Sequence, residues 1–397
     1  MKNNFPLLLA FILIGNLYAG QSYVVVGTGQ SKCYSASGEI APPRPGQPFY
    51  GQDAQHPGPA FRYQDNGDGT VSDLNTGLEW VKERGQKGLW SEAVAGAAKC
   101  RVGGHSDWRM PSIKELYSLI NFNGGCHGSV ANSTPYLDTK YFDFVYGDES
   151  RGERIIDSQD WSATPYTGTT MSGNITVFGV NFADGRIKGY PKAFPNGRGA
   201  MMYHRYVRGN TQYGRNDFHD HGDGTITDQA TGLMWSRDDS KVGVNWQVSL
   251  SWVEKKNAEN YLGHGDWRLP NAKELQSIVD YTRAPTSTHS PAIDSVFRTT
   301  TLGDGEYPFY WSSTTHLDGP LNRQGMAAVY VALGRATGWM QFPPGRGAYR
   351  LVDVHGAGAQ RSDSKAGDPA DFPHGRGPQG DVCRIFNFVR LVRGGQN

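Results

Sequence analysis

Short runs of alternating apolar residues predict β-strands in the larger part of the chain. Phe61 and Tyr63 form one such run, and Leu78 and Trp80 form another. The strings NGDG and NTG lie between these runs, and Asn, Asp and Gly favour the backbone angles of tight turns. We therefore predict short antiparallel strands joined by hairpin turns over residues 61–81.

Apolar residues at helical spacing follow the predicted hairpins. A first helix is indicated by Trp90, Val94, Ala97 and Cys100. A second begins after Pro111, a residue that suits the first turn of a helix. Its apolar face consists of Ile113, Leu116, Leu119 and Ile120. The same two faces recur later as Trp246, Leu250 and Val253, and as Ala272, Leu275, Ile278 and Val279.

Longer strand-like runs lie at residues 176–182, 327–333 and 386–392. The order along the chain is hairpins, two helices and then several strands, and this order occurs twice. Helices that are segregated from antiparallel strands are typical of the α+β class. We therefore predict two α+β domains, each with short hairpins, two helices and a small antiparallel sheet.

An internal repeat supports this division. The string DNGDGTVSDLNTGLEW at residues 65–80 returns as DHGDGTITDQATGLMW at 220–235, and GHSDWRMPSIKELYSLI at 104–120 returns as GHGDWRLPNAKELQSIV at 263–279. Three weaker pairs follow in the same order: DWSATPY with YWSSTTH, FPNGRG with FPHGRG, and YVRG with LVRG. Five blocks in one order indicate a tandem duplication.

The repeat sets the predicted domain boundaries. A lead-in segment covers residues 20–60, the first copy 61–210 and the second copy 211–397. The spacing between the copies widens at FPHGRG, so the second copy has gained residues within 345–382. This late insert is rich in Gly, Arg, Pro, Asp and Ser, and we expect it to be mostly loop.

The first residues predict export. Lys2 precedes an apolar run from Pro6 to Ile14, and Ala19 supplies a small residue where a signal peptidase would cut. The run is shorter than the roughly 20 apolar residues that span a bilayer, and no later stretch is long enough. We interpret residues 1–19 as a signal peptide, so the mature protein would be secreted, or held at the cell surface or in the periplasm, without a membrane span.

Composition excludes one class of function. The 397 residues contain 39 Lys and Arg against 38 Asp and Glu, a net charge of +1. A protein that binds nucleic acid through a strongly basic surface would carry a clear positive excess. Aromatic residues make up 12% of the chain and can fill compact cores despite the 52 glycines.

The four cysteines would meet an oxidising environment after export. They are Cys33, Cys100, Cys126 and Cys383. Spacing alone allows three pairings. Cys100 ends one predicted helix and Cys126 follows the next, so we predict a local disulfide between them, with Cys33 and Cys383 either free or joined to each other.

The repeated blocks resemble the Lcl C-terminal domain family, a bacterial extracellular module named after a collagen-like adhesin. The resemblance rests on DNGDGTVSDLNTGLEW, GHSDWRMPSIKEL, WSSTT at Trp311 and VRLVRGG at Val389, and it covers both copies. The WRxPxxxEL block and the terminal strand also resemble the C-type-lectin-like fold, including its formylglycine-generating branch. This resemblance implies two tandem C-type-lectin-like domains with a role in adhesion.

The acidic turns are a candidate metal site. Three carboxylates surround a Gly-containing turn in each copy, and oxygen-rich turns suit a hard cation such as Ca²⁺. The residues are Asp65, Asp68 and Asp73 in the first copy and Asp220, Asp223 and Asp228 in the second. The twelfth position, where an EF-hand has Glu, is Thr76 or Thr231. Turn chemistry alone also explains these residues, and Ca²⁺ is the one cofactor that the sequence leaves open.

The repeated Trp-Arg pair has a structural interpretation. We expect Trp108 and Trp267 in the core, and Arg109 paired with Glu115 as Arg268 is with Glu274. His105 and His264 precede these pairs without a second ligand at metal spacing. Neither HExxH nor GxSxG occurs, and only Cys383 lies where a formylglycine-generating enzyme would need two cysteines.

The C-terminal stretch is the candidate ligand site. Residues 331–397 carry nine basic and five acidic side chains. Guanidinium groups bind sulfate and carboxylate, and aromatic rings stack on sugars. The predicted ligand-binding residues are Arg346, Arg350, Arg361, Arg376, Trp339 and Tyr349. The interleaved aspartates are also typical of a solvated loop with internal ion pairs.

Taken together, these features favour a non-enzymatic adhesion or recognition protein whose partner is an extracellular, anionic glycan or another cell-surface component. Two alternatives remain at this stage: an exported enzyme on a formylglycine-generating-like scaffold, and a structural envelope protein without a small ligand.

Overall fold

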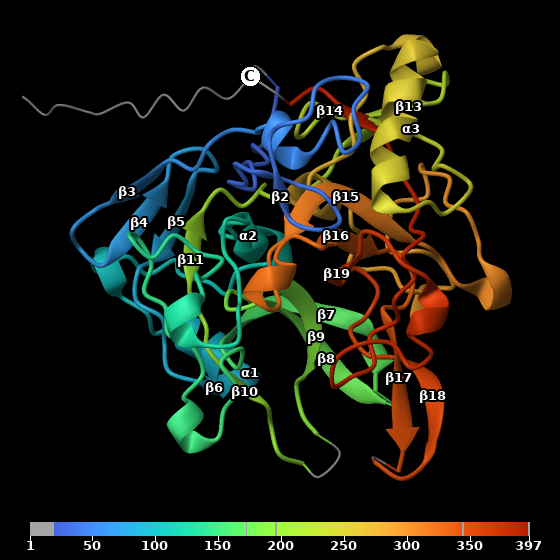
Figure 1. The fold of residues 1–397 in the computed structure, drawn as a ribbon. Coiled ribbons are helices and arrows are strands. Elements are labelled where there is room, and N and C mark those ends of the chain that lie inside the picture. Colours follow the sequence, from blue (N-terminus) through green and yellow to red (C-terminus); the bar gives the residue numbers. More distant parts are fainter. Residues whose placement is uncertain (1–19, 172, 195–196, 344, 396–397) are drawn as a thin grey trace, which may run out of the picture.

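The structure of the protein is a computed structural model that describes residues 20–171, 173–194, 197–343 and 345–395 (Figure 1). The predicted signal peptide, residues 1–19, lies outside the described residues. Helices and antiparallel strands are mixed in both copies, as the sequence predicts for an α+β protein.

Each copy begins with a three-stranded antiparallel meander that its closing strand completes. The strands of the first copy are β3 (Tyr63–Asp65), β4 (Thr70–Asp73), β5 (Leu78–Val81) and β11 (Val207–Gly209). Those of the second are β12 (Phe218–Asp220), β13 (Thr225–Asp228), β14 (Leu233–Ser236) and β20 (Val392–Arg393). The strand orders β11-β5-β4-β3 and β20-β14-β13-β12 are equivalent, so the duplication is a structural one. The run at 386–392 is strand only at its end.

Two helices follow each meander, at the predicted places. They are α1 (Trp90–Ala97) and α2 (Ile113–Ser118) in the first copy, and α3 (Trp246–Ala258) and α4 (Ala272–Ser277) in the second. Ser112 and Asn271 begin α2 and α4 with capping boxes, each completed by a glutamate three residues later. The predicted apolar faces are buried, except that Trp90 and Cys100 are partly exposed and Val94 is 40% exposed. A short further helix, α5, covers Pro285–Thr288.

The predicted arginine–glutamate pairs are confirmed. Arg109 donates to both oxygens of Glu115 at 2.7 and 2.5 Å. Arg268 contacts Glu274 in the same way at 2.5 and 2.6 Å. The neighbouring tryptophans of both copies are buried. Because the same glutamates cap α2 and α4, each pair fixes a helix start to the block before it.

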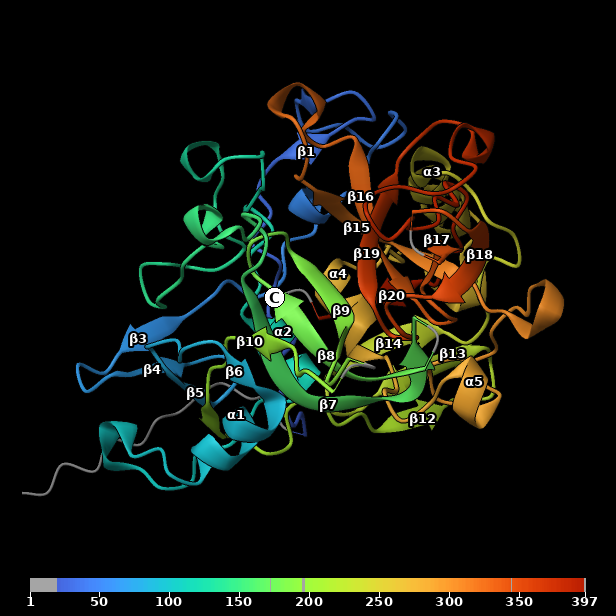
Figure 2. The same cartoon turned by 90° about the horizontal axis from the view of Figure 1, so that it is seen from below.

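Three strands from each copy join in one six-stranded antiparallel sheet (Figure 2). They are β7 (Gln159–Thr170), β8 (Asn174–Asn181) and β9 (Arg186–Pro191) from the first copy, and β15 (Phe309–His316), β16 (Ala327–Ala332) and β19 (Gln360–Ser364) from the second. The order is β15-β16-β19-β9-β8-β7, and β19 meets β9 where Gln360 pairs with Ile187. The sequence predicted a separate small sheet in each copy. The two sheets merge because the exposed edges of β9 and β19 pair with each other.

Helices α2 and α4 contact each other and are joined by two equivalent lysines. Lys114 of α2 donates to the carbonyl of Ser277 at 2.6 Å, and Lys273 of α4 donates to the carbonyl of Ser118 at 2.7 Å. Burial lowers the pKa of Lys114 to about 8 and that of Lys273 well below its ordinary value. The two copies are therefore held together by a core as well as by a sheet.

The lead-in segment packs into the second copy. It contains β1 (Cys33–Tyr34) and β2 (Glu39–Ile40). The side chain of Gln30 bonds with the backbone of Thr315, and Asp53 accepts hydrogen bonds from Thr28 and Thr314 at 2.7 and 2.5 Å. Burial raises the pKa of Asp53 to about 6. The lead-in also contacts the first copy, where Phe122 donates its amide to the carbonyl of Thr28 at 2.8 Å, so it links the two copies.

The late insert differs from the predicted loop. Strands β17 (Thr337–Phe342) and β18 (Ala348–Asp353) form a hairpin that projects from the body of the protein (Figure 1), and β19 enters the central sheet. A smaller sheet, β6 (Gly88–Leu89) with β10 (Met201–Met202), is found in the first copy. The insert has a weak apolar pattern, but it forms strands because the backbone of β18 pairs with β17 and that of β19 pairs with β16.

The predicted disulfide between Cys100 and Cys126 is not formed, and all four cysteines are free thiols. Cys100 follows α1, close to Tyr206. Cys126 is buried against the second copy, where its amide donates to Asp318 at 3.0 Å. The two residues are near in sequence, but the chain between them crosses from the outer side of the first copy to the junction.

Candidate functional site

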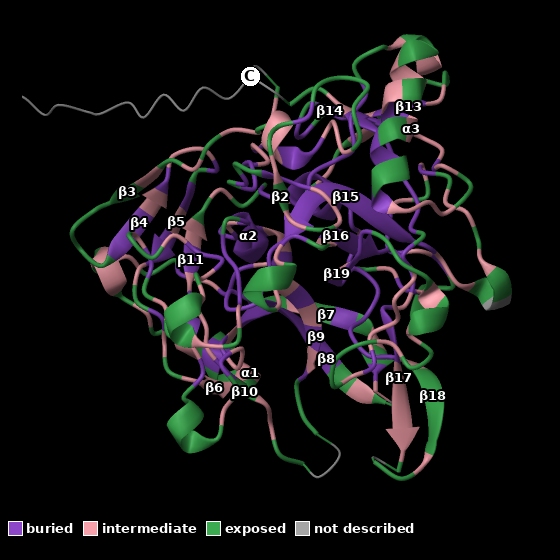
Figure 3. Ribbon diagram, viewed as in Figure 1, coloured by how far each residue is buried: buried purple, intermediate pink, exposed green. Residues whose placement is uncertain are grey.

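The projecting hairpin carries most of the predicted ligand-binding residues. Trp339 of β17 and Tyr349 of β18 lie on one face, since Trp339 pairs with Leu351 and Gln341 with Tyr349. His374 stacks on Tyr349 with ring centroids 3.6 Å apart and meets the edge of Trp339 at 6.4 Å. We call Trp339, Tyr349 and His374 the aromatic face. Strand β18 of the hairpin is mostly exposed, and β17 is mostly of intermediate exposure (Figure 3).

Three of the four predicted arginines lie in the hairpin or in the segment that carries His374. Arg346 lies in the hairpin turn, Arg350 points to the opposite side of β18, and Arg376 stacks over Phe372 at 4.0 Å. All three are exposed, and none forms an ion pair with a carboxylate of the described residues. They are therefore available to an anionic ligand.

Glycine holds the segment with His374 against the hairpin. Trp339 donates its backbone N–H to the carbonyl of Gly380 at 2.8 Å. Gly380 has a φ of +61°, and a Cβ atom there would lie 2.2 Å from the carbonyl oxygen of Trp339. A residue with a side chain cannot make this approach, so the aromatic face depends on a glycine at this position.

Arg361 lies elsewhere. It is 7% exposed in β19, where it forms an ion pair with Asp381. Sequence reasoning placed it with the loop arginines because β19 reads as a polar segment. The structure places it instead at the junction of the two copies.

The acidic turns use their carboxylates within the turns. Asp68 accepts hydrogen bonds from the amide and hydroxyl of Thr70, as Asp223 does from Thr225. Asp65 and Asp220 accept from the amides of Gly67 and Gly222. Asp73 and Asp228 are buried and cap the following turns. In the described parts of the chain, no three His, Cys, Asp or Glu side chains are grouped so that they could hold a metal ion.

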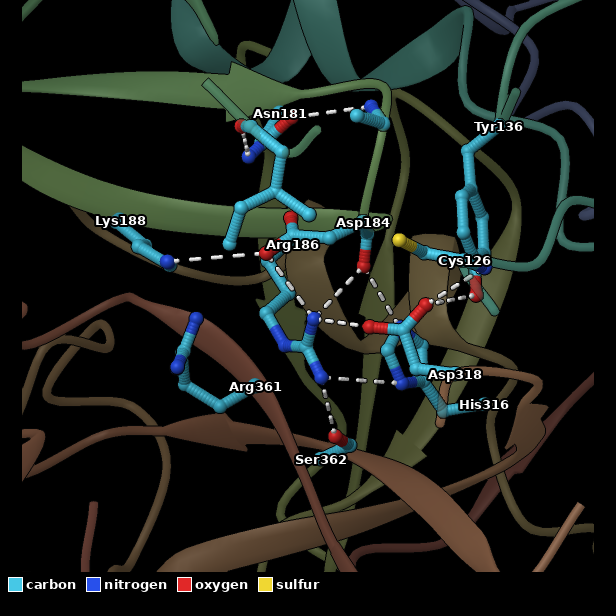
Figure 4. Close-up of polar contacts among 12 residues, drawn as sticks. Cys126, Tyr136, Asn181, Asp184, Arg186, Lys188, His316, Asp318, Arg361 and Ser362 are labelled. Atoms are coloured by element: carbon cyan, nitrogen blue, oxygen red, sulfur yellow. Dashed lines mark hydrogen bonds and ion pairs between the residues drawn. The ribbon is translucent and has the colours of Figure 1, made fainter. Parts of the chain in front are cut away.

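A buried charged cluster, which sequence reasoning missed, lies at the junction of the copies (Figure 4). Arg186 of β9 forms ion pairs with Asp318 and with Asp184, the latter at 3.0 Å. Asp318 also accepts hydrogen bonds from Tyr136 and from the amide of Cys126. Burial favours the neutral form of Asp184, but the charges of Lys188 and Arg186 outweigh it and lower its pKa.

Two histidines of this region are neutral. His316 donates through Nε2 to the carbonyl of Asp184 at 2.9 Å, and its Nδ1 lies 3.5 Å from Arg186. His355 contacts Asp381 at 2.8 Å. Burial, with the charges of Arg186 and Arg361 respectively, lowers the pKa of each histidine to about 4.

A cleft of about 680 Å³ opens beside the cluster. Its lining includes Lys188, Tyr190, Arg154, Met171 and Gln379, so both copies contribute to it. One sequence pattern could have indicated this cluster, namely the alternation of Arg186, Lys188 and Tyr190 along one strand. Strand β19, which pairs with β9, could not be predicted from the sequence because it lies in the late insert, which was expected to be mostly loop.

Another cavity, of about 630 Å³, lies between α2 and the segment after α4. Lys114 lines it but is already bonded to Ser277, Gly214 and Asn216. Among the described helices, none combines the length and apolar character needed to cross a membrane.

Comparison with known proteins identifies the family. Residues 69–208 and 224–352, well over half of the chain, each match the Lcl C-terminal domain. The chain belongs to the Lcl C-terminal domain family. No curated protein and no solved structure matches it.

The second Lcl C-terminal domain match ends at residue 352, inside β18. The string FPPGRG at 342–347, like FPHGRG at 372–377, is similar to FPNGRG of the first copy. The first match reaches the closing strand β11, whereas the second stops before the closing strand β20.

Proposed function

We propose that the protein is a non-enzymatic binding protein that acts in adhesion or recognition outside the cytoplasm and that its ligand is an anionic glycan. The observation that carries this proposal is the projecting hairpin, where an aromatic face lies on one side and three arginines without carboxylate partners lie in the hairpin or beside it. The proposal includes a C-type-lectin-like arrangement of each domain, on the strength of the repeated WRxPxxxEL block.

The chemistry of the hairpin fits such a ligand. Sugar rings present C–H groups that pack on Trp and Tyr rings, as apolar surface does. Guanidinium groups bind sulfate and carboxylate through charge-assisted hydrogen bonds. Exposed charge contacts are screened by salt, so binding should weaken as ionic strength rises.

Retention on a heparin column tests the proposal. We expect the triple variant Arg346→Ala, Arg350→Ala and Arg376→Ala to elute at much lower salt than the parent, and Trp339→Ala to weaken retention further. The control is Arg44→Ala, Arg151→Ala and Arg323→Ala, which removes the same charge from exposed positions elsewhere. Equal loss in both triple variants would show that retention reflects net charge alone, and the proposal would fail.

A further inference from the structure

A second group of cations lies on one face of β9 and borders the hairpin through Asp381, which bridges to Gly338 of β17. Ile187 packs in the core that α2 and α4 cover, so Arg186, Lys188 and Tyr190 lie on the opposite face. Gln360 of β19 pairs with Ile187, which places Arg361 on the same face as Arg186.

Several donors in this group have no acceptor. Arg361 uses Nη2 for its ion pair with Asp381, but its Nε and Nη1 are buried without a hydrogen-bond partner among the described residues. The same is true of the Tyr190 hydroxyl. The nearest carboxylate oxygen to the Lys188 ammonium, on Asp184, is 3.7 Å away. Because buried donors are rarely left unsatisfied, these groups indicate an acceptor that comes from outside the chain.

The charges around Lys188 also favour a bound anion. Burial, together with the neighbouring charges of Arg361 and Arg186, lowers the pKa of Lys188 to about 8. Asp184 is shared with Arg186, and Asp381 is shared with His355. Figure 4 shows the Lys188 and Arg361 side chains directed toward the same space. An added anion would lower the repulsion between these two cations.

A cleft gives an anion access to this group of cations. Lys188 and Tyr190 line the cleft of about 680 Å³, which Gln379 borders from the second copy. The geometry points to an oxyanion-binding site formed by Lys188, Tyr190 and Arg361, which takes a sulfate or carboxylate group of a ligand that enters through this cleft. The site borders the hairpin but uses none of the aromatic face or the three exposed arginines, and it rests on the proposed function only for the identification of that ligand as a glycan.

Calorimetric titration with sodium sulfate and with sodium acetate, at constant ionic strength, tests the site in the full chain. Tyr190→Phe is the sharpest variant, because removal of an unbonded hydroxyl costs the fold nothing. Lys188→Met replaces a buried ammonium by an apolar chain of similar length. Lys192→Met, on an exposed lysine beyond the site, is the control.

We expect one of the two anions to bind the parent, with at least ten-fold weaker binding in Lys188→Met, several-fold weaker binding in Tyr190→Phe and no change in Lys192→Met. Sulfate alone would assign a sulfate ester, and acetate alone a carboxylate. Absence of binding to the parent, or equal binding in all variants, would overturn the site. The hairpin triple variant should keep this binding, so the two proposals can fail independently.

Discussion

Glu115 and Glu274 occupy equivalent positions in the two copies, but their arginine partners are exposed to different extents. The Arg109 side chain is 32% exposed, whereas that of Arg268 is 5% exposed. Removing one partner of a buried ion pair leaves the other charge uncompensated, at a cost of about 3–5 kcal/mol, while water can solvate a partly exposed one. We expect Glu274→Gln to lower the free energy of unfolding by about 3 kcal/mol and Glu115→Gln by about 1 kcal/mol. Urea denaturation of both variants measures this, and equal losses would contradict it.

His316 should make the protein sensitive to mild acid. Its folded pKa of about 4 lies below the ordinary value of 6.5, so the unfolded chain binds a proton that the folded chain excludes. The stabilising effect of the neutral ring is complete above pH 6.5 and is lost as the pH falls toward 4. The shift corresponds to about 3 kcal/mol.

A replacement at His316 isolates this effect from the acids around it. His316→Gln keeps a side-chain donor but does not titrate. We expect the unfolding free energy of the parent to fall more steeply than that of the variant between pH 6.5 and 4. Parallel curves for the two proteins would show that His316 does not carry the dependence.

At the scale of elements, Gly380 connects the segment of His374 to β17. Gly380→Ala combines a left-handed backbone, with a cost of about 1 kcal/mol, with a clash against the Trp339 carbonyl. Gly377→Ala is a matched control, since Gly377 has a similar φ of +69° and open space around it. We expect only Gly380→Ala to detach the segment, seen as faster amide exchange at residues 372–381 and reduced heparin retention. Identical exchange in both variants would contradict the assigned role.

Several elements could be predicted because residues close together in the sequence determine them. Tight turns follow from Asn, Asp and Gly, and the helix faces follow from apolar spacing. Strand β19 was missed because QRSDS reads as a polar loop. It is buried because its polar groups find partners far along the chain: Arg361 pairs with Asp381, and Asp363 accepts from the amides of Arg384 and Ile385.

Contacts between distant parts of the chain also limited what could be predicted of the candidate site. Trp339 and Tyr349 were identified by residue type, and the structure places them on one face. His374 was missed, since its stacking on Tyr349 depends on the return of the chain to β17. Arg361 was identified as an anion-binding residue. Its burial depends on the pairing of the two copies, which no local sequence pattern predicts.

At the scale of the whole molecule, the two copies share one core. The same cluster of buried apolar residues contains Ile120 and Phe178 from the first copy and Leu275 and Tyr281 from the second. The rings of Phe178 and Tyr281 lie 4.9 Å apart. Separation of the copies would expose this surface and the unpaired edge of β9.

We therefore expect residues 61–210, produced alone, to self-associate or remain unfolded. Size-exclusion chromatography with light scattering and circular dichroism would measure this, with residues 20–397 as the reference. A folded monomer of residues 61–210 would show that the first copy does not need the second.

Amide hydrogen exchange can show whether the hairpin and its aromatic face bind an anionic glycan. The full chain would be compared with and without a heparin-derived oligosaccharide, at low and at high salt. We expect slower exchange at residues 337–353 and 372–381 at low salt, with the effect lost at high salt. Unchanged exchange in both segments while the oligosaccharide is bound would contradict it.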